Sequence, residues 1–386
     1  MNTESLLFAM LRSEVCGEEI LQETESFLDS DTLQELYVLS KRHDMTHIVT
    51  QAIRKLNVDT DNEVIKSFEK QQMLAIFRYQ KIQYELERLC GALEEAKIKY
   101  IPLKGSVIRN YYPEPWLRTS CDIDIFVESK DLSDAVEYIV EKLNYKKGNK
   151  NLHDYSLFSE SGVHLELHYD LIEEMRHPAF ANILSGIWEH AHLKEGFEYQ
   201  YLLNDDFFYY YHIAHMVKHF EEGGCGIRPF LDLWILNHRL TYESSSREEI
   251  LRLGNLSVFA KTADKLSEVW FSCAEHDDIT LQMEKYILFG GVYGNLENKV
   301  SLQQQKKGGR LQYVFLKIFP RYSVLKLQFP VLKKHPYLYP VFVVYRWFSW
   351  LFKDNAKNTI RELSLNNTVS KDKVDEVADL YSKLGL

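Results

Sequence analysis

The stretch "CDIDIFV" at residues 121–127 places two carboxylates in an otherwise apolar run, and this alternation predicts a β-strand. Side chains two residues apart lie on the same face of a strand, so Asp122 and Asp124 share one face, while Ile123, Ile125 and Val127 share the other. Two ionised carboxylates that lie this close repel each other and lose hydration. The strand therefore requires a compensating positive charge on its polar face.

The residues before this strand predict a strand, a turn and a helix. "KYIPL" (99–103) predicts a short edge strand, because Pro102 cannot donate a hydrogen bond to a neighbouring strand. The turn "KGS" (104–106) then opens a helix, "SVIRNYY" (106–112), which prolines 113 and 115 end.

The residues after this strand predict a hairpin. "HDYSLFSE" (153–160) and "VHLELHYDL" (163–171) flank a Ser-Gly turn. In the second arm Val163, Leu165, Leu167 and Tyr169 face one way, whereas His164, Glu166 and His168 face the other. A third carboxylate, Glu166, is thus expected on the polar face of a strand.

Most of the remaining chain carries apolar residues at spacings of three and four, which predicts helices. The expected fold class is α+β, a small mixed or antiparallel sheet with extensive flanking helical regions. The predicted regions are an N-terminal helical region (1–98), a sheet core (99–171), a helical region that closes a cleft over the core (172–300), and a basic, aromatic-rich C-terminal helical region (301–386). Within the last region, "QQQKKGG" (303–309) predicts a flexible link.

The net charge of −10 conceals an asymmetry, because residues 301–360 carry eleven Lys and Arg against a single acid, Asp354. This segment either touches an anionic partner or docks on the acidic body of its own chain. The five cysteines are widely scattered without a C-x-x-C pair, and the first twenty residues, which have no basic stretch followed by a long apolar run, are not expected to form a secretory signal. Reduced thiols and a cytoplasmic protein are therefore expected.

One strongly apolar segment, "PYLYPVFVVYRWFSWLF" (336–352), is interrupted by Pro340 and Arg346. It falls short of the ~20 apolar residues that a membrane-spanning helix needs. A buried helix is the favoured interpretation. Contact with a membrane surface by the 301–360 segment is the alternative, because lysines and tryptophans near this helix suit a lipid headgroup layer.

Candidate ligands for a phosphate and a metal lie together in this pattern. Gly105 and Ser106 at a helix N-terminus offer backbone N–H groups and a hydroxyl, which suit a phosphate group. Asp122, Asp124 and Glu166 offer the hard oxygen ligands that Mg²⁺ prefers. A divalent ion would also compensate the repulsion between the two aspartates.

The stretch "LKGSVIRNYYPEPWLRTSCDIDIFV" (103–127) resembles the nucleotidyltransferase superfamily with the DNA polymerase beta-like fold. More closely, it is similar to a bacterial uncharacterised nucleotidyltransferase family with a Leu-Lys-Gly turn, a Tyr-Tyr-Pro-x-Pro-x-x-Arg connection and an Asp-Ile-Asp strand. The similarity continues through "VHLELHYDL", "HMVKHF", "GIRPFLDL" and "KKHPYLYP". Fifteen residues separate Ser106 from Asp122, more than in the minimal antitoxin-type relatives, which leaves the base preference open.

This resemblance implies Mg²⁺-dependent transfer of a nucleoside monophosphate, AMP from ATP by default, to a hydroxyl of a small molecule or a protein. It implies that Asp122 and Asp124 bridge one or two metal ions and that Glu166 holds the catalytic ion. Gly105 and Ser106 would bind the β- and γ-phosphates. Lys104 and Arg118 are candidate cationic partners of the triphosphate. Nucleic acid is not expected as a partner, because no basic and aromatic track accompanies the site.

Several further residues are candidates for the wall of the cleft: His168, His215, His219, Arg228 and Asp232. The histidines at 212, 215 and 219 share one helix face. This cluster forms a transition-metal site, a polar seam between helices or part of the cleft wall, and the sequence leaves these three alternatives open.

Two other functions compete with catalysis of nucleotidyl transfer. The first is a non-catalytic nucleotide-binding or regulatory module, similar to an antitoxin that retains the fold. The second is a metal-dependent phosphohydrolase that uses the histidines together with the acids.

Overall fold

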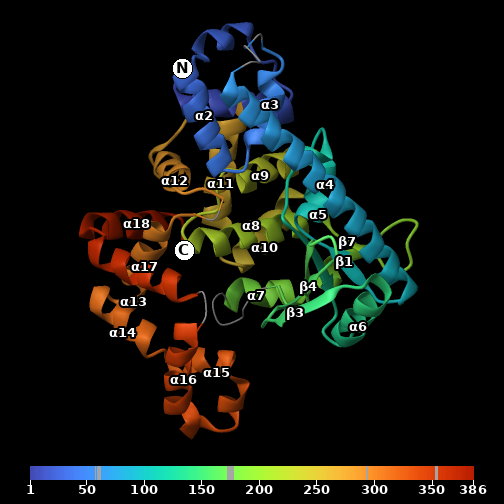
Figure 1. Ribbon diagram of the computed structural model, residues 1–386, viewed down its shortest axis with the longest axis vertical. Helices are drawn as coiled ribbons and strands as arrows, with labels where there is room; N and C mark the ends of the chain where they lie inside the picture. Colours follow the sequence, from blue (N-terminus) through green and yellow to red (C-terminus); the bar gives the residue numbers. More distant parts are fainter. Residues whose placement is uncertain (57, 59–61, 172–177, 293, 353–354) are drawn as a thin grey trace. The chain divides into compact units, whose positions relative to one another are not determined.

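The computed structural model describes residues 1–56, 58, 62–171, 178–292, 294–352 and 355–386 (Figure 1). Its contacts divide the chain into two compact units. The first unit contains residues 1–216 and 227–280, and the second contains residues 217–226 and 281–386. The division into four regions that the sequence suggests stays a prediction.

The first unit contains a mixed five-stranded sheet, which confirms the expected α+β class. Its strands are β1 (Tyr100–Pro102), β2 (Asp122–Val127), β3 (Lys146–Lys150), β4 (Asp154–Phe158) and β5 (His164–His168). The spatial order is β1-β2-β5-β4-β3, with β2 and β5 parallel and the other pairs antiparallel. The predicted edge strand and the predicted hairpin are both confirmed. Strand β3, which is polar and mostly exposed, was not predicted.

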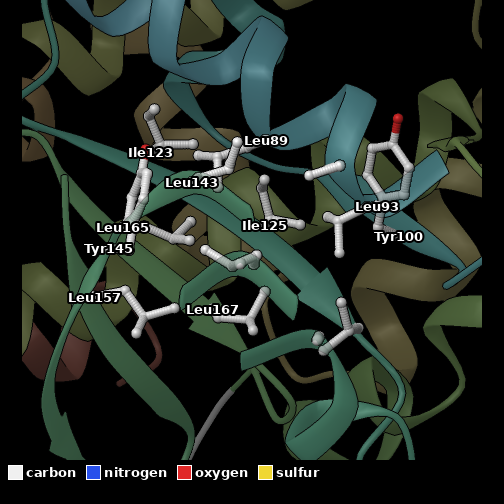
Figure 2. Close-up of a cluster of buried hydrophobic side chains, with 14 of the residues drawn as sticks. Leu89, Leu93, Tyr100, Ile123, Ile125, Leu143, Tyr145, Leu157, Leu165 and Leu167 are labelled. Atoms are coloured by element: carbon white, nitrogen blue, oxygen red, sulfur yellow. The ribbon is translucent and has the colours of Figure 1, made fainter. Parts of the chain in front are cut away.

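The apolar face of the sheet is covered by two helices, α4 (Glu63–Glu95) and α6 (Leu132–Leu143). Figure 2 shows side chains of these helices gathered with those of the central strands. Ile123, Ile125 and Leu165 are fully buried there, as the alternation predicted. This packing fixes which face of β2 and β5 carries the polar side chains.

The segment between β1 and β2 forms short helical turns. Helix α5 spans only Gly105–Ile108 and is followed by 3₁₀ turns at Arg109–Tyr111 and Pro115–Leu117. The predicted helix at 106–112 therefore exists only in part. Further along, α8 (Asp205–Glu221) and α9 (Arg228–Arg239) are separated by the predicted glycine break, where Gly223, Gly224 and Gly226 have positive φ.

Helices make up most of the remaining first unit, as predicted. They are α1 (Thr3–Leu11), α2 (Ser30–Arg42), α3 (Thr46–Ile53), α7 (Pro178–Ser185), α10 (Ser244–Leu253) and α11 (Ser257–Ser272), and α12 (Asp278–Leu288) crosses into the second unit. Residues 172–300, which were expected to be mostly helical, also contain a two-stranded sheet of β6 (Ala191–Leu193) and β7 (Tyr201–Leu203), which was not predicted.

The second unit contains a succession of helices, namely α13 (Leu296–Lys307), α14 (Arg310–Ile318), α15 (Tyr322–Gln328), α16 (Tyr339–Phe352), α17 (Asn355–Thr368) and α18 (Lys371–Lys383). The flexible link predicted at 303–309 is wrong, because α13 continues to Lys307 and only Gly308 and Gly309 interrupt the helices. Among the described residues, no helix has the length and apolar character needed to cross a membrane.

The buried helix predicted at 336–352 is also wrong. Residues 336–338 form a 3₁₀ turn and α16 follows. Val341 is 60% exposed, Tyr345 57% and Phe348 58%. An apolar composition does not by itself indicate burial, because it does not show what covers the helix.

Candidate functional site

Strands β2 and β5 bring the predicted carboxylates together. Their parallel register places Asp122 opposite His164 and Asp124 opposite Glu166, with all four side chains on the polar face of the sheet. Two overlapping groups result, one of Asp122, His164 and Glu166 and one of Asp124, Glu166 and His168. Within each group, one ligand atom per residue lies within 4.8 Å of the others. Glu166 belongs to both groups.

Asp124 is the most strongly bound of these carboxylates. Lys104 donates from Nζ to Oδ1 of Asp124 at 2.7 Å, and Nε2 of His168 lies 2.8 Å from the same oxygen. Burial opposes ionisation, but Lys104 and His168 outweigh it and hold the pKa of Asp124 below its usual range. Both contacts use Oδ1, so Oδ2 is the oxygen available for a ligand.

The pKa values of Lys104 and His168, the two basic partners of Asp124, are raised rather than lowered. Burial favours the neutral amine, yet the carboxylate of Asp124 raises the pKa of Lys104 above its ordinary value. Burial also disfavours a charged imidazole, but the hydrogen bonds to Asp124 and Glu166 raise the pKa of His168. Each positive charge is thus stabilised by the acidic face on which it lies.

The raised pKa of Asp122 reflects the loss of hydration and the repulsion that the sequence pattern indicated for this pair of carboxylates. Burial raises the pKa of Asp122, and repulsion from Asp124 raises it further. The pKa of Glu166 is lowered instead, chiefly by its contact with His168, whose Nε2 lies 3.4 Å from Oε2. A divalent cation on this face would relieve the repulsion at Asp122, so the donor set fits Mg²⁺.

The loop before α5 provides a possible phosphate-binding element. Lys104 has a φ of 46° and a ψ of −123°, an unusual conformation for a residue with a side chain. A Cβ atom on Gly105 would lie 3.2 Å from Cβ of Ser120 and 3.4 Å from Nη1 of Arg118. A larger residue at this position would therefore require its neighbours to shift by a few tenths of an ångström.

Ser106 offers its hydroxyl rather than its amide. The backbone N–H of Ser106 already donates to the carbonyl of Leu103 at 3.1 Å. Its side-chain Oγ is buried and has no hydrogen-bond partner among the residues that the structure describes. A buried hydroxyl without a partner costs free energy, and a ligand oxygen would satisfy it.

Arg118 forms an ion pair with an acid of α9. It donates from Nε and Nη2 to Asp232 of α9, at 2.8 Å for the shortest contacts, and both residues are buried. Tyr112 donates to the same carboxylate at 2.8 Å. These contacts tie the segment between β1 and β2 to α9. A contact of Arg118 with the triphosphate stays a prediction, and so does a place for Asp232 in the cleft wall.

Arg109 is a candidate that the sequence interpretation missed. It is 1% exposed, and it donates from Nε to the carbonyl of Gly105 at 2.5 Å and from Nη2 to Oγ of Ser120 at 2.6 Å. Burial, with a contribution from Arg118, lowers the pKa of Arg109 to about 10. The sequence contained one signal for this contact. Arg109 follows Gly105 by four residues, and this spacing places the two residues on the same side of a helical turn.

Tyr211 of α8 is the second missed candidate. It is buried, and burial raises the pKa of its phenol, which also interacts electrostatically with Lys104, Asp124 and Glu166. In the sequence, the aromatic run at 207–211 indicates only the buried side of a helix. That Tyr211 approaches the acidic face follows from the tertiary structure alone.

The histidines of α8 do not join the acidic groups. Neither group found in the described part of the chain includes His212, His215 or His219. Nε2 of His212 lies 2.8 Å from the carbonyl of Pro229, and burial lowers the pKa of this imidazole. His212 thus contributes to a polar seam between α8 and α9.

The remaining predicted cleft residues occupy different positions. The ring of His215 lies 6.2 Å from that of Tyr211, whereas His219 belongs to the second unit. Arg228 lies with Nη1 3.4 Å from Oδ2 of Asp44. A role of these three residues in the cleft wall stays a prediction.

Comparison with known proteins agrees with this geometry. The model of a family described as "Uncharacterised nucleotidyltransferase" matches residues 29–272, which is more than half of the chain and includes the sheet, the loop before α5, α8 and α9. No curated protein and no solved structure matches. The family match confirms the resemblance seen in residues 103–127. The chain therefore belongs to this uncharacterised nucleotidyltransferase family.

Proposed function

We propose that the protein is a Mg²⁺-dependent nucleotidyltransferase that transfers AMP from ATP to a hydroxyl of a small molecule or a protein and releases pyrophosphate. One observation carries the proposal. Asp122, Asp124 and Glu166 lie on one face of two parallel strands, and Lys104, which binds Asp124, directly precedes α5, whose Ser106 hydroxyl has no partner among the described residues. Members of the family are expected to use this combination for nucleotide and metal. The cytoplasm, which supplies ATP and Mg²⁺, is the proposed location.

The three carboxylates would hold Mg²⁺, which when bound lowers the pKa of the acceptor hydroxyl and neutralises charge on the leaving pyrophosphate. A bond forms between the acceptor oxygen and the α-phosphorus, and the bond from that phosphorus to the bridging oxygen of the β-phosphate breaks. Glu166 or solvent takes the hydroxyl proton. His168 orients Asp124, Lys104 balances its charge, and Ser106 donates a hydrogen bond to a phosphate oxygen.

Neutralising Asp122 is the cleanest test of the metal platform. Asp122→Asn should lower the rate of nucleotidyl transfer by at least about a hundredfold. It should leave the free energy of unfolding unchanged or slightly higher, because burial and repulsion from Asp124 raise the pKa of this carboxyl in the folded state. Asp124→Asn should also abolish transfer but should destabilise the fold, because it leaves the partly buried Lys104 without its anionic partner.

The matched control is Asp134→Asn, which neutralises an exposed acid in the first turn of α6. It should keep full activity. Full activity of Asp122→Asn would contradict the proposed role of the polar face.

Catalysis and mere binding are separated in two steps. Calorimetry should detect binding of Mg²⁺ and ATP, and a pyrophosphate assay over pooled hydroxyl acceptors should then detect release. Binding without release from any pool would favour the non-catalytic module.

The phosphohydrolase alternative is supported by one feature, the imidazole in each acidic group, because imidazoles suit transition metals. The histidines concerned are His164 and His168 of β5 rather than those of α8. Metal analysis after dialysis tests this alternative. A retained transition metal that His168→Ala removes would favour hydrolysis.

A further inference from the structure

A long segment of the second unit contains no acidic residue. Residues 298–352 include ten Lys and Arg but neither Asp nor Glu. Two of these lysines pair with acids outside the segment, Lys306 with Glu221 and Lys317 with Glu362. Others are exposed and form no ion pair within the described part of the chain, including Arg321, Lys333 and Lys334.

Helix α16 presents an apolar face to solvent. Val341, Val344, Tyr345 and Phe348 are 43–60% exposed, and their spacing of three and four places them along one side of the helix. The opposite side carries Val343, which packs with residues of α15 and the following 3₁₀ turn in a small core. Helix α16 therefore has two apolar faces, one that packs in this small core and one that is exposed.

Helix α14 adds a second exposed apolar row. Leu311 is 88% exposed, Phe315 59% and the following Phe319 41%. The ring of Phe319 lies 5.3 Å from that of Trp347 in α16, and Nε1 of Trp347 donates to the carbonyl of Ile318 at 2.8 Å. The end of α14 and α16 are thus in direct contact through Phe319 and Trp347.

We define the apolar-basic surface by these two rows and by exposed basic residues of the same acid-free segment, namely Leu311, Phe315, Phe319, Val341, Val344, Tyr345, Phe348, Arg321, Lys333 and Lys334. We propose that this surface binds peripherally to a bilayer that contains anionic phospholipid. Its lysines and arginines complement the headgroup charge, and no acid within residues 298–352 opposes them. Its aliphatic and aromatic side chains suit the boundary between headgroups and acyl chains.

A nucleic acid as the partner would account for the basic residues of this surface but not for its exposed aliphatic side chains. Phosphates attract the basic residues, but aliphatic side chains such as Leu311, Val341 and Val344 contribute little to such contacts. A bilayer uses both kinds of side chain. The proposal is independent of the chemistry at Asp122 and Asp124.

The test is sedimentation of the full chain with vesicles. Vesicles of phosphatidylcholine and phosphatidylglycerol should bind the protein at least about tenfold more strongly than vesicles of phosphatidylcholine alone. High salt should weaken the binding, because it screens the headgroup charge.

Two double variants examine the two components of the surface. Lys333→Glu with Lys334→Glu should weaken binding by more than about tenfold through charge reversal. Val344→Ser with Phe348→Ser should weaken it by about tenfold through loss of apolar contact. All four side chains are exposed, so the thermal unfolding midpoint should not change.

Matched controls exist in the first unit. Lys146→Glu with Lys147→Glu reverses an adjacent, exposed pair in β3, and Met73→Ser with Phe77→Ser removes an exposed apolar pair from α4. Both should bind vesicles like the unmodified protein. The proposal is overturned if the controls weaken binding equally, if neither surface variant changes it, or if the protein binds single-stranded RNA but not the anionic vesicles.

Discussion

Gly105 leaves little space for a larger side chain next to the site. The Cβ of Gly105→Ala would press on Ser120 and on the guanidinium of Arg118, which is held by Asp232. We expect this variant to lose about 1–3 kcal/mol of unfolding free energy through overpacking and to bind ATP more weakly. Denaturant unfolding and calorimetry measure the two effects.

Gly91→Ala is the control for this substitution. Gly91 lies within α4, and nothing lies within 4 Å of an added Cβ. It should stabilise the protein by about 0.5–1 kcal/mol, because alanine loses less conformational freedom in a helix. Equal effects of the two variants would show that the space around Gly105 is not limiting.

The ion pair between Arg118 and Asp232 predicts a defined pH dependence of stability. Burial opposes ionisation of Asp232, but Arg118 outweighs it and lowers the pKa of this carboxyl in the folded state. A lowered folded pKa contributes stability that is present above the unfolded value, about 3.9, and is lost as the pH falls through the folded value. Asp232→Asn should therefore cost about 3–5 kcal/mol near neutral pH.

The difference between the unmodified protein and Asp232→Asn should shrink as the pH falls below about 4, because the unfolded chain takes up the proton first and the native carboxylate takes it up only at lower pH. Denaturant unfolding over a series of pH values measures it. Asp134→Asn, at an exposed position, should stay within about 0.5 kcal/mol of the unmodified protein. A difference for Asp232→Asn that does not change with pH would contradict the assignment.

Local alternation was sufficient to predict which residues face the site, but not which residues they contact. Asp122, Asp124 and Glu166 followed from the period of two in a strand. Arg118 finds its partner Asp232 at a separation of 114 residues, and Tyr211 reaches the acidic face from α8. Such contacts depend on tertiary packing, which no local pattern contains.

Among the elements, the parallel pair β2 and β5 is the one that builds the site. The sequence predicted both strands but not that β5 inserts between β2 and β4, which places Glu166 beside Asp124. Leu165 lies directly opposite Ile123 in this pair and is fully buried. Leu165→Ala should cost about 2–5 kcal/mol of unfolding free energy, because it leaves a cavity beneath the polar face.

The same variant should also weaken Mg²⁺ binding, because β5 carries Glu166 next to the altered residue. Denaturant unfolding and metal titration by calorimetry measure the two effects. Leu152→Ala, at a position that is 46% exposed, should change neither. If the Leu165→Ala protein is destabilised but its metal affinity is unchanged, the packing of β2 against β5 does not control metal binding, and the prediction is contradicted.

The elements that the sequence predicted wrongly have physical explanations. Gln and Lys are good helix formers, so α13 continues through "QQQKK" and ends only where Gly308 adopts a φ of 83°. Strands β6 and β7 have three residues each, too few for an alternation to be recognised. Helix α16 is apolar on opposite sides, and composition alone cannot show which side is covered.

For the whole molecule, the sheet of the first unit and the α15–α16 region of the second unit differ in how many buried residues stabilise them. A cluster of twenty buried residues surrounds the sheet of the first unit, whereas the cluster between α15 and α16 has three buried residues. Fewer buried apolar contacts lower the free energy of local opening. Amide hydrogens in residues 322–348 should therefore exchange faster than those of β2 and β5.

Hydrogen exchange followed by peptide mass spectrometry measures this difference across the full chain. Equal protection of the two regions would contradict the inferred difference in stability. Addition of vesicles that contain phosphatidylglycerol should slow exchange in residues 310–348 and leave β2 and β5 unchanged, because only the apolar-basic surface is expected to contact lipid. Mg²⁺ with ATP should produce the converse pattern, with slower exchange in the loop before α5 and in β2. Opposite responses to the two ligands would assign lipid binding to the second unit and nucleotide binding to the first.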